Sequence, residues 1–581
     1  MGGLTSLSKD RATLTGATVC AVLLLLLCLP VLDRPGMQTD ETLFAAGIYG
    51  PYDESNVVSI GGLHIPLMLM TYVGTFKSLL YRPIVAVFGT SPWAIRLPGV
   101  LLSSLSVFAF TLLLVEVTKV RAALLAGAVL ATDPIYVLYS RWDHGPVVTL
   151  HLLLVMALLS YARFFRDHRL RWLALGSLCL GLALWEKAVF MWLLAGMALS
   201  LPIAFGLSGY RRHSSPRSLL VAAAFFAIGA LPLFLYNIRH SMVTFRSNAR
   251  LDTTSIKGKT ELLRHTFEGN ALFGSMMREP WDGPAKDPAH PLDAAIANIS
   301  KLTAERRKGC GLWIFGICLL VLPFARNFPG AKFGLFALVA GSLAFAQMLF
   351  TKGAGTAAHH TILLWPLPYV ITGISLAYLW AKSRRPAFKV VLTLFVLACC
   401  VSNLLVLATY YRFLIRNGGT DSWTEAMYPS LAYIRSTDKS AVGVVDWGFL
   451  DTVRLSEQGR TPIFALEDPA TASDKDVLRR IVETPNIVFI SHSDGHETFP
   501  GITARLFAFA ELHGYTPADV RKFFDYNGRY TVRTFRFQKA RDAGGGVQVG
   551  RRFHQTTESD RRTRAPRGSH AYAGMPQAGS G

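Results

Sequence analysis

The sequence has little cysteine, with seven residues in a chain of 581 and none in C-x-x-C spacing. All seven lie within or at the edge of apolar runs. A disulfide framework or a structural zinc site needs paired or closely spaced ligands. The cysteine pattern therefore predicts neither.

Nucleotide-binding motifs are also lacking. The Gly-Lys-Thr string at 258–260 looks like the end of a phosphate-binding P-loop, but Thr253 stands where that motif needs its first glycine. Asp474 and Asp476 form a D-x-D string within a helical pattern. The topology derived below places that pattern outside the cytoplasm, where nucleotide sugars are not normally found. We therefore expect no nucleotide site at either string.

Apolar residues are abundant, at 51% of the chain. A transmembrane helix needs about 20 apolar residues, and the sequence contains runs of that size at 12–32, 93–115, 121–139, 146–165, 172–186, 188–207, 218–237, 309–325, 333–350, 360–380 and 388–411. The predicted fold class is a mainly α, polytopic membrane protein of about eleven transmembrane helices.

Acidic residues are few relative to basic ones, 38 against 59, which gives a net charge of +21. With the N-terminus in the cytoplasm, every inward connection is basic, as the positive-inside rule requires. These connections carry Lys9, Arg11, Lys119, Arg121, Arg163, Arg166, Arg169, Arg171, Arg211, Arg212, Arg217, Arg326, Lys332, Lys382, Arg384, Arg385 and Lys389. Much of the positive charge thus reflects topology, and we predict no nucleic-acid partner.

Two apolar segments need separate treatment. The run at 12–32 is long and has no small-x-small cleavage pattern after it, so we interpret it as a retained anchor rather than a signal peptide. Residues 63–89 are long enough to span the membrane, but a crossing there would place every later basic loop outside. We expect them to lie on the outer surface as one or two short helices, broken near Pro83.

The larger connections all face outward. They comprise residues 33–92, residues 238–308 and everything after 411. The strings SAVGVVDWG and NIVFISHS predict buried strands, with a helix at ASDKDVLRRIVET between them. The predicted organisation is a membrane domain at 1–411, an extracytoplasmic α/β domain at 412–540, and a disordered basic tail at 541–581.

Asp40 and Glu41 follow the first span directly. Adjacent carboxylates repel each other, so one of them should hold its proton more tightly than an isolated acid and could act as a general base. The alternative is an exposed helix start, in which Thr39 caps the helix and the two acids favour its first turn. The residues alone leave both interpretations open.

Three further clusters face the same side of the membrane. These clusters are Arg141 and Asp143 beside His144, Glu186 and Lys187 at the turn between two spans, and His359 and His360 near Lys352. Each also has a simpler interpretation. The first could be an internal ion pair, the second a lysine that snorkels to the membrane surface, and the third two adjacent histidines whose side chains point in different directions. Their shared location suits a site where cations hold an anionic lipid headgroup while a carboxylate deprotonates the attacking group.

Several of these strings together resemble the GT-C membrane glycosyltransferases. They are the Asp-Glu pair, YVGTFKSLLYRPIVAVFG, SPWAIRLPGVLLSSLSV, SRWDHGPV and HHTILLWPLP. The branch they resemble includes protein O-mannosyltransferases and bacterial lipid A aminoarabinose transferases. The likeness covers residues 1 to about 410. The sequence differs from these branches at the Trp-Asp-His-Gly-Pro string and at the His-His pair.

The resemblance implies inverting transfer of a sugar from a polyprenyl-phosphate donor to an acceptor hydroxyl outside the cytoplasm, in a bacterial inner membrane. It makes Asp40 the expected base, with Glu41 orienting it or the acceptor. Lys77 and Lys187 resemble donor-phosphate contacts, and Asp143 falls where relatives carry another acid. Expected partners are the lipid-linked sugar, a protein, lipid or glycan acceptor, and membrane lipids. No cofactor is implied with certainty, although a divalent cation is compatible; no metal ligands are assigned.

Two other functions fit a polytopic membrane protein. A transporter or flippase would carry charges inside its spans and a symmetrical repeat, whereas these charges cluster at the ends of spans. A catalytically silent membrane scaffold would use the outer α/β domain to bind a partner. The sequence names neither the sugar nor the acceptor.

Overall fold

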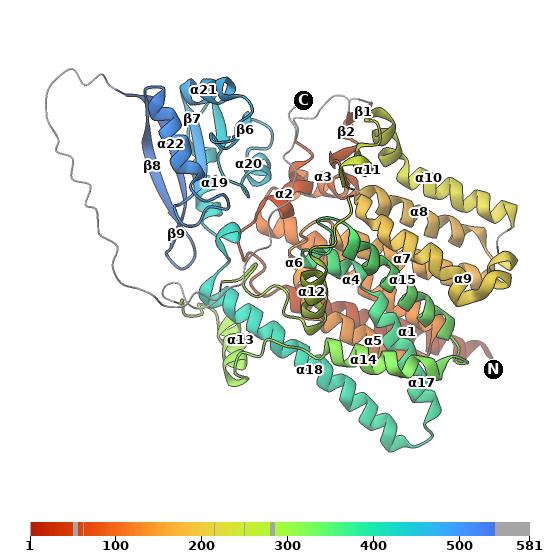
Figure 1. The fold of residues 1–581 in the computed structure, drawn as a ribbon. Helices are drawn as coiled ribbons and strands as arrows, with labels where there is room; N and C mark the ends of the chain where they lie inside the picture. Colours follow the sequence, from red (N-terminus) through yellow and green to blue (C-terminus); the bar gives the residue numbers. More distant parts are fainter. Residues whose placement is uncertain are drawn as a thin grey trace.

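The computed structural model describes residues 2–540, apart from 50–55, 62, 214, 249 and 279–284. Figure 1 shows a large helix bundle with a smaller sheet-containing domain at one end. The predicted disordered tail at 541–581 lies outside the described residues.

The membrane portion contains long helices that pack into a bundle and several shorter ones around them (Figure 1). They are α1 (Gly2–Cys28), α2 (Thr39–Ala46), α3 (Phe76–Phe88), α4 (Pro92–Val117), α5 (Val120–Thr132), α6 (Pro134–Arg141), α7 (Val147–Asp167), α8 (Leu170–Glu186), α9 (Met191–His213), α10 (Pro216–Arg239), α11 (Val243–Asn248), α12 (Ile256–Glu268), α13 (Pro291–Leu302), α14 (Gly311–Val321), α15 (Ala331–Phe350), α16 (Ala358–Thr361), α17 (Leu367–Lys382) and α18 (Pro386–Asn417). Short 3₁₀ helices η2 (Ala188–Phe190), η3 (Leu322–Ala325) and η4 (Ile362–Leu364) extend three of them.

Within the described residues, eight helices are long and apolar enough to cross a membrane, and the bent pair α5–α6 makes a ninth. The two remaining predicted spans are shorter: α8 has 17 residues, and the other apolar helix covers Gly311–Ala325. The mainly α, polytopic membrane fold is thus confirmed, while the number of eleven spans remains a prediction.

The break between α5 and α6 has a local cause. Asp133 precedes Pro134, whose ring disfavours helical backbone in the residue before it, and Asp133 is extended. Its carboxylate then caps α6 by accepting from the Tyr136 N–H at 2.8 Å. The predicted span at 121–139 is therefore two helices that meet at 61°.

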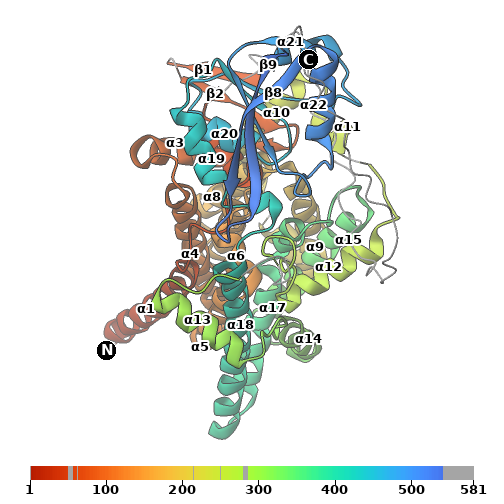
Figure 2. The ribbon, with the colours of Figure 1, turned by 90° about the vertical axis from the view of Figure 1, so that its left-hand side faces the viewer.

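Residues 63–89 differ from the prediction in their first third. The segment contains strands β2 (Leu63–Pro66), β3 (Met68–Met70) and β4 (Val73–Gly74), which form small hairpins with β1 (Val57–Ile60) and with each other. Pro83 lies inside α3 and does not break it. Figure 2 shows α3 at the same end of the bundle as the C-terminal domain, as a surface segment requires.

The C-terminal domain is a three-layer α/β unit, which confirms the predicted fold class. Its helices and strands are η5 (Asp421–Trp423), α19 (Met427–Ser436), β5 (Ala441–Val444), α20 (Leu450–Glu457), β6 (Ile463–Ala465), α21 (Lys475–Glu483), β7 (Ile487–His492), α22 (Ile502–Leu512), β8 (Tyr515–Phe524) and β9 (Tyr530–Lys539). The strand order is β6-β5-β7-β9-β8, with β5 parallel to both neighbours. Apolar side chains of α19 and α20 pack on one face, and those of α21 and α22 on the other.

Burial on both faces explains why β5 and β7 read as continuous apolar runs rather than alternating ones. Val442 pairs with Val488 in the register of these two strands. The D-x-D string is the start of α21, because the Asp474 carboxylate caps that helix by accepting from the N–H groups of Asp476 and Val477. The helical interpretation of that string is thus the one that the structure supports.

Candidate functional site

Asp40 lies in the first turn of α2, where the helix dipole favours a negative charge. Gln38, rather than Thr39, caps the helix by accepting from the Asp40 N–H. The Oδ2 atom of Asp40 lies 2.8 Å from Nε2 of His144, which is in the turn after α6. Both side chains are partly exposed, at 23% and 16%. Among the described residues Asp40 Oδ1 has no hydrogen-bond partner, so only one of the two carboxylate oxygens is engaged.

The pKa of Asp40 is lowered, whereas repulsion from the adjacent Glu41 would raise it. Burial by itself would raise that pKa, but the charge and hydrogen bond of His144, the charge of Lys187 and the hydrogen bond from Gln38 together lower it. The carboxylate is therefore ionised at neutral pH. Repulsion from Glu41 does not control it, because the two adjacent acids face different partners.

Glu41 is buried and held by Arg96 of α4. The Arg96 Nε donates to Glu41 Oε1 at 2.6 Å and Nη2 donates to Oε2 at 2.8 Å, a two-point contact that occupies both carboxylate oxygens. Arg96 Nη1 also donates to the Leu32 carbonyl at 2.8 Å. Arg96 therefore fixes α2 and the segment before it on the membrane helices, a geometry that suits an orienting residue.

Lys77 and Asp143 form a buried ion pair, with 2.7 Å between Nζ and Oδ2. The Lys77 ammonium also lies 4.5 Å from the centre of the Phe44 ring, on α2. Asp143 accepts from the Val148 N–H at 3.0 Å, which caps the start of α7. The structure thus brings Lys77 and Asp143 together directly beneath α2.

Glu186 braces the same region from the end of α8. Its Oε2 accepts from the Lys77 backbone N–H at 3.0 Å, and its Oε1 accepts from the Thr149 hydroxyl at 2.9 Å. Both oxygens are occupied, and the side chain is fully buried. Glu186 therefore ties α3, α7 and α8 together around the candidate site.

Lys187 follows α8 and is less tightly held than Lys77. Within the described part of the chain, its ammonium makes one hydrogen bond, which it donates to the Gly145 carbonyl over 3.4 Å. Burial lowers the pKa of Lys187 to about 8, although the negative charges of Asp40, Asp143 and Glu186 oppose that shift. A Cβ on Gly145 would lie 3.0 Å from Lys187 Nζ, so the glycine leaves room for the ammonium.

His359 and His360 complete one side of the cluster. The His359 ring lies 4.6 Å from the His144 ring, and the two adjacent histidine rings are 4.2 Å apart, centre to centre. The Nδ1 atoms of His359 and His360 are buried and have no hydrogen-bond partner among the described residues. The Trp423 ring lies 5.7 Å from His144 on another side.

Comparison with known proteins gives a consistent assignment. The family described as Dolichyl-phosphate-mannose-protein mannosyltransferase matches residues 76–236. ArnT from Cupriavidus metallidurans in the apo state superposes with a TM-score of 0.55 at 13% identity, over 91% of this chain and 98% of that one. The chain has the GT-C glycosyltransferase fold.

Two other solved structures share this fold. ArnT bound to undecaprenyl phosphate matches with a TM-score of 0.53 at 11% identity, over 90% of this chain and 97% of ArnT. The apo oligosaccharyltransferase of Archaeoglobus fulgidus matches with a TM-score of 0.50 at 14% identity, over 91% of this chain and 75% of that one. No curated protein matches the sequence.

Arg141 contacts the segment that follows α1. Its Nη2 donates to the carbonyls of Pro30 and Val31 at 2.7 and 2.6 Å, and its guanidinium packs on Trp142 and Tyr411. It therefore holds the backbone that follows α1. The simpler interpretation, in which Arg141 pairs with Asp143, is wrong, because Asp143 pairs with Lys77.

Sequence reasoning did not select His144, Arg96 or Trp423 as site residues. His144 was within reach of that reasoning, since it follows Asp143 in a polar turn between spans. In the sequence, Arg96 is typical of an arginine at the membrane surface where a span begins, and Trp423 lies in a linker. Neither therefore gives a sequence signal that it belongs to the site. Their contribution depends on contacts between residues far apart in the chain: Arg96 pairs with Glu41, 55 residues away, and Trp423 packs on His144.

The C-terminal domain contacts α2 directly. The Thr39 N–H donates to the Gly448 carbonyl at 3.1 Å, and the hydroxyls of Thr42 and Thr452 are 3.1 Å apart. Asp451, next to Thr452 on α20, is buried near Asp40; burial raises its pKa to about 6, against the opposing charge of Arg454. The helix that carries Asp40 is thus packed between membrane helices and the outer domain.

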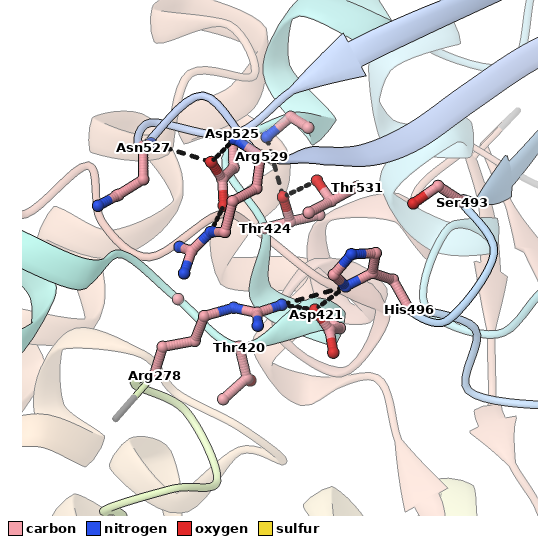
Figure 3. Close-up of polar contacts among 12 residues, drawn as sticks. Arg278, Thr420, Asp421, Thr424, Ser493, His496, Asp525, Asn527, Arg529 and Thr531 are labelled. Carbon is pink, nitrogen blue, oxygen red and sulfur yellow. Dashed lines mark hydrogen bonds and ion pairs between the residues drawn. The ribbon is translucent and has the colours of Figure 1, made fainter. Parts of the chain in front are cut away.

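A polar cluster fixes the linker that carries Trp423. Figure 3 shows Arg278 and His496 pointing toward Asp421 from opposite sides, and the His496 Nδ1 lies 2.6 Å from Asp421 Oδ1. Beside them, the Thr424 and Thr531 hydroxyls are 2.6 Å apart. Because η5 is held at both ends, Trp423 keeps its position against the His144 ring.

Asp40 and His144 are residues of the types that bind metal ions. Across the described ranges, no three His, Cys, Asp or Glu side chains converge as a metal site. Asp40 and His144 together would supply two ligands. A divalent cation therefore stays an open prediction, with no ligand set assigned.

Proposed function

We propose that this chain is an inverting glycosyltransferase that moves a sugar from a polyprenyl-phosphate donor to an acceptor hydroxyl, on the extracytoplasmic face of a bacterial inner membrane. The observation that carries the proposal is the state of Asp40. One of its carboxylate oxygens is held by His144, the other has no hydrogen-bond partner among the described residues, and the group is ionised next to Lys187. That is the arrangement a general base for a hydroxyl group requires.

The reaction can be written on these residues. The acceptor hydroxyl attacks the anomeric carbon, forming the new glycosidic bond while its proton passes to Asp40 Oδ1. The bond between the anomeric carbon and the phosphate oxygen breaks, and its electron pair leaves with the polyprenyl phosphate. Because attack and departure are on opposite faces of the sugar, the anomeric configuration inverts.

Lys187 is the better placed of the two lysines to receive the leaving phosphate. Its ammonium has one long hydrogen bond, whereas Lys77 is held by Asp143 at 2.7 Å. A cation at that point stabilises the negative charge that develops as the bond breaks. Lys77, Asp143, His359 and His360 line the same region, and we retain them as substrate contacts; for Arg141 we propose support of the segment that precedes α2.

The related structures support the donor class. ArnT has been solved with undecaprenyl phosphate, which is a polyprenyl phosphate, and it shares this fold over nearly the whole of both chains. The matching family is described by a dolichyl-phosphate-linked sugar. The N-terminus is proposed to be cytoplasmic, which puts the Asp40 cluster and the C-terminal domain together on the outer side.

The proposal is tested by incubating membranes that contain the full-length protein with radiolabelled polyprenyl-phosphate sugars. Lipid, glycan and protein fractions are then separated. We expect label to move with the wild-type chain and not with Asp40→Asn, which keeps the shape but cannot take a proton at neutral pH. Asp476→Asn is the matched control, because that carboxylate is 74% exposed on α21. Equal transfer by wild type and Asp40→Asn would exclude Asp40 as the base.

A further inference from the structure

A cavity of about 580 Å³ lies between the C-terminal domain and the point where α4 enters the membrane portion. The residues of its wall that matter here are Asp33, Phe88, Trp93, Arg435, Thr452 and Ser456. They come from the segment after α1, from the α3–α4 junction, and from α19 and α20.

The outer rim of the cavity is apolar and exposed. Phe88, at the end of α3, is 71% exposed, and Trp93 in the first turn of α4 is 48% exposed. Because α4 is a candidate span that starts at Pro92, these side chains lie at the level where the chain enters the bilayer. Exposed aromatic residues at that level contact the lipid interface. The cavity therefore opens toward membrane lipid.

Three polar groups lie among the apolar side chains of the cavity wall. The Ser456 hydroxyl is buried and has no hydrogen-bond partner among the described residues. Asp33 and Arg435 are exposed, and neither forms an ion pair within the described part of the chain. The wall thus offers one negative group, one positive group and one unsatisfied hydroxyl, which complements a ligand that carries both charges.

We propose that this cavity binds the headgroup of a membrane aminophospholipid, with its phosphate at Arg435, its ammonium at Asp33 and its acyl chains over Phe88 and Trp93. The site does not depend on the transferase activity proposed above. It is linked to α2, however, because Thr452 lines the cavity and its hydroxyl lies 3.1 Å from that of Thr42. A bound headgroup would hold the outer domain on the membrane surface and against the helix of Asp40.

The test is a lipid titration of the purified full-length protein in detergent, with bound lipid counted by native mass spectrometry. The probes are phosphatidylethanolamine, phosphatidylglycerol and phosphatidylcholine. Arg435→Gln is expected to lower the phosphatidylethanolamine affinity about tenfold, the effect of losing one charge-assisted hydrogen bond. Asp33→Asn should weaken phosphatidylethanolamine but not phosphatidylglycerol, which has no ammonium. Phosphatidylcholine should bind less tightly than phosphatidylethanolamine, because its nitrogen carries no N–H to donate.

Arg480→Gln is the matched control, since Arg480 is an exposed arginine on α21 of the same domain and outside the cavity wall. Asp33 and Arg435 are both exposed and lie on different segments, so each variant is expected to keep the wild-type melting temperature. Unchanged phosphatidylethanolamine binding in either variant would overturn the proposal. Equal binding of phosphatidylglycerol and phosphatidylethanolamine would overturn the headgroup assignment.

Discussion

The affinity for the sugar donor is expected to fall as the pH rises from 7 to 9, because Lys187 loses its proton in that range. Burial lowers its pKa to about 8, and only the protonated ammonium attracts a phosphate. The protonated fraction is about nine-tenths at pH 7 and about one-tenth at pH 9. If the protonated form alone binds, the apparent affinity falls about tenfold over these two pH units. The donor itself is a phosphodiester, which does not titrate there.

The measurement is donor binding to the purified protein at several pH values between 7 and 9.5. In Lys187→Arg the guanidinium stays charged throughout, so the alkaline loss of affinity should disappear even if the geometry of the new side chain weakens binding overall. Lys352→Arg, at an exposed lysine on the same side of the membrane, should keep the wild-type profile. A flat wild-type profile, or a persistent alkaline fall in Lys187→Arg, would refute the role of Lys187 as the titrating phosphate contact.

Three further predictions concern Glu41, His144 and Asp451. Glu41→Gln leaves Arg96 buried without its counter-charge, so we expect a loss of about 3–5 kcal/mol in unfolding free energy, seen as a lower melting temperature; an unchanged melting temperature would contradict the buried pair. His144→Ala removes the group that most lowers the pKa of Asp40, so the acid limb of the pH–rate profile should move to higher pH, and an unmoved limb would show that His144 does not control the base. The pKa of Asp451 is raised from 3.8 to about 6, so the folded state binds its proton more tightly and the wild type loses stability as pH rises from about 4 to 6. Asp451→Asn should then be more stable than wild type at pH 7.5, by on the order of 3 kcal/mol, but not at pH 4; equal thermal shifts at both pH values would contradict this.

The C-terminal domain is an integral part of the candidate site rather than an appended module. It contacts α2 through Gly448 and Thr452, and its linker places Trp423 against His144. Substitutions at these contacts are therefore expected to affect transfer to every acceptor. This differs from a domain that only selects among acceptors, in which turnover with a permissive acceptor would be unaffected.

The sequence by itself determined the fold class, and it predicts the side of the membrane on which to look for the site. Long apolar runs must be helices in a bilayer, because no water is present there to satisfy exposed backbone groups. Basic loops oriented those helices, and four clusters of charged residues then fell on one face. The two buried strands of the outer domain were also predictable, since β5 and the first four residues of β7 form apolar runs.

Only the tertiary structure decided the state of each charged group. Asp40 and Glu41 are neighbours in sequence, yet a helix turns them toward His144 and Arg96, whose positions depend on how α4 and the turn after α6 pack. Likewise, Asp143 could pair with either Arg141 or Lys77 by charge alone, and the packing of the helices pairs it with Lys77. The sequence fixes which charges are available, whereas the distances that determine their partners and pKa values arise from contacts between residues far apart in the chain.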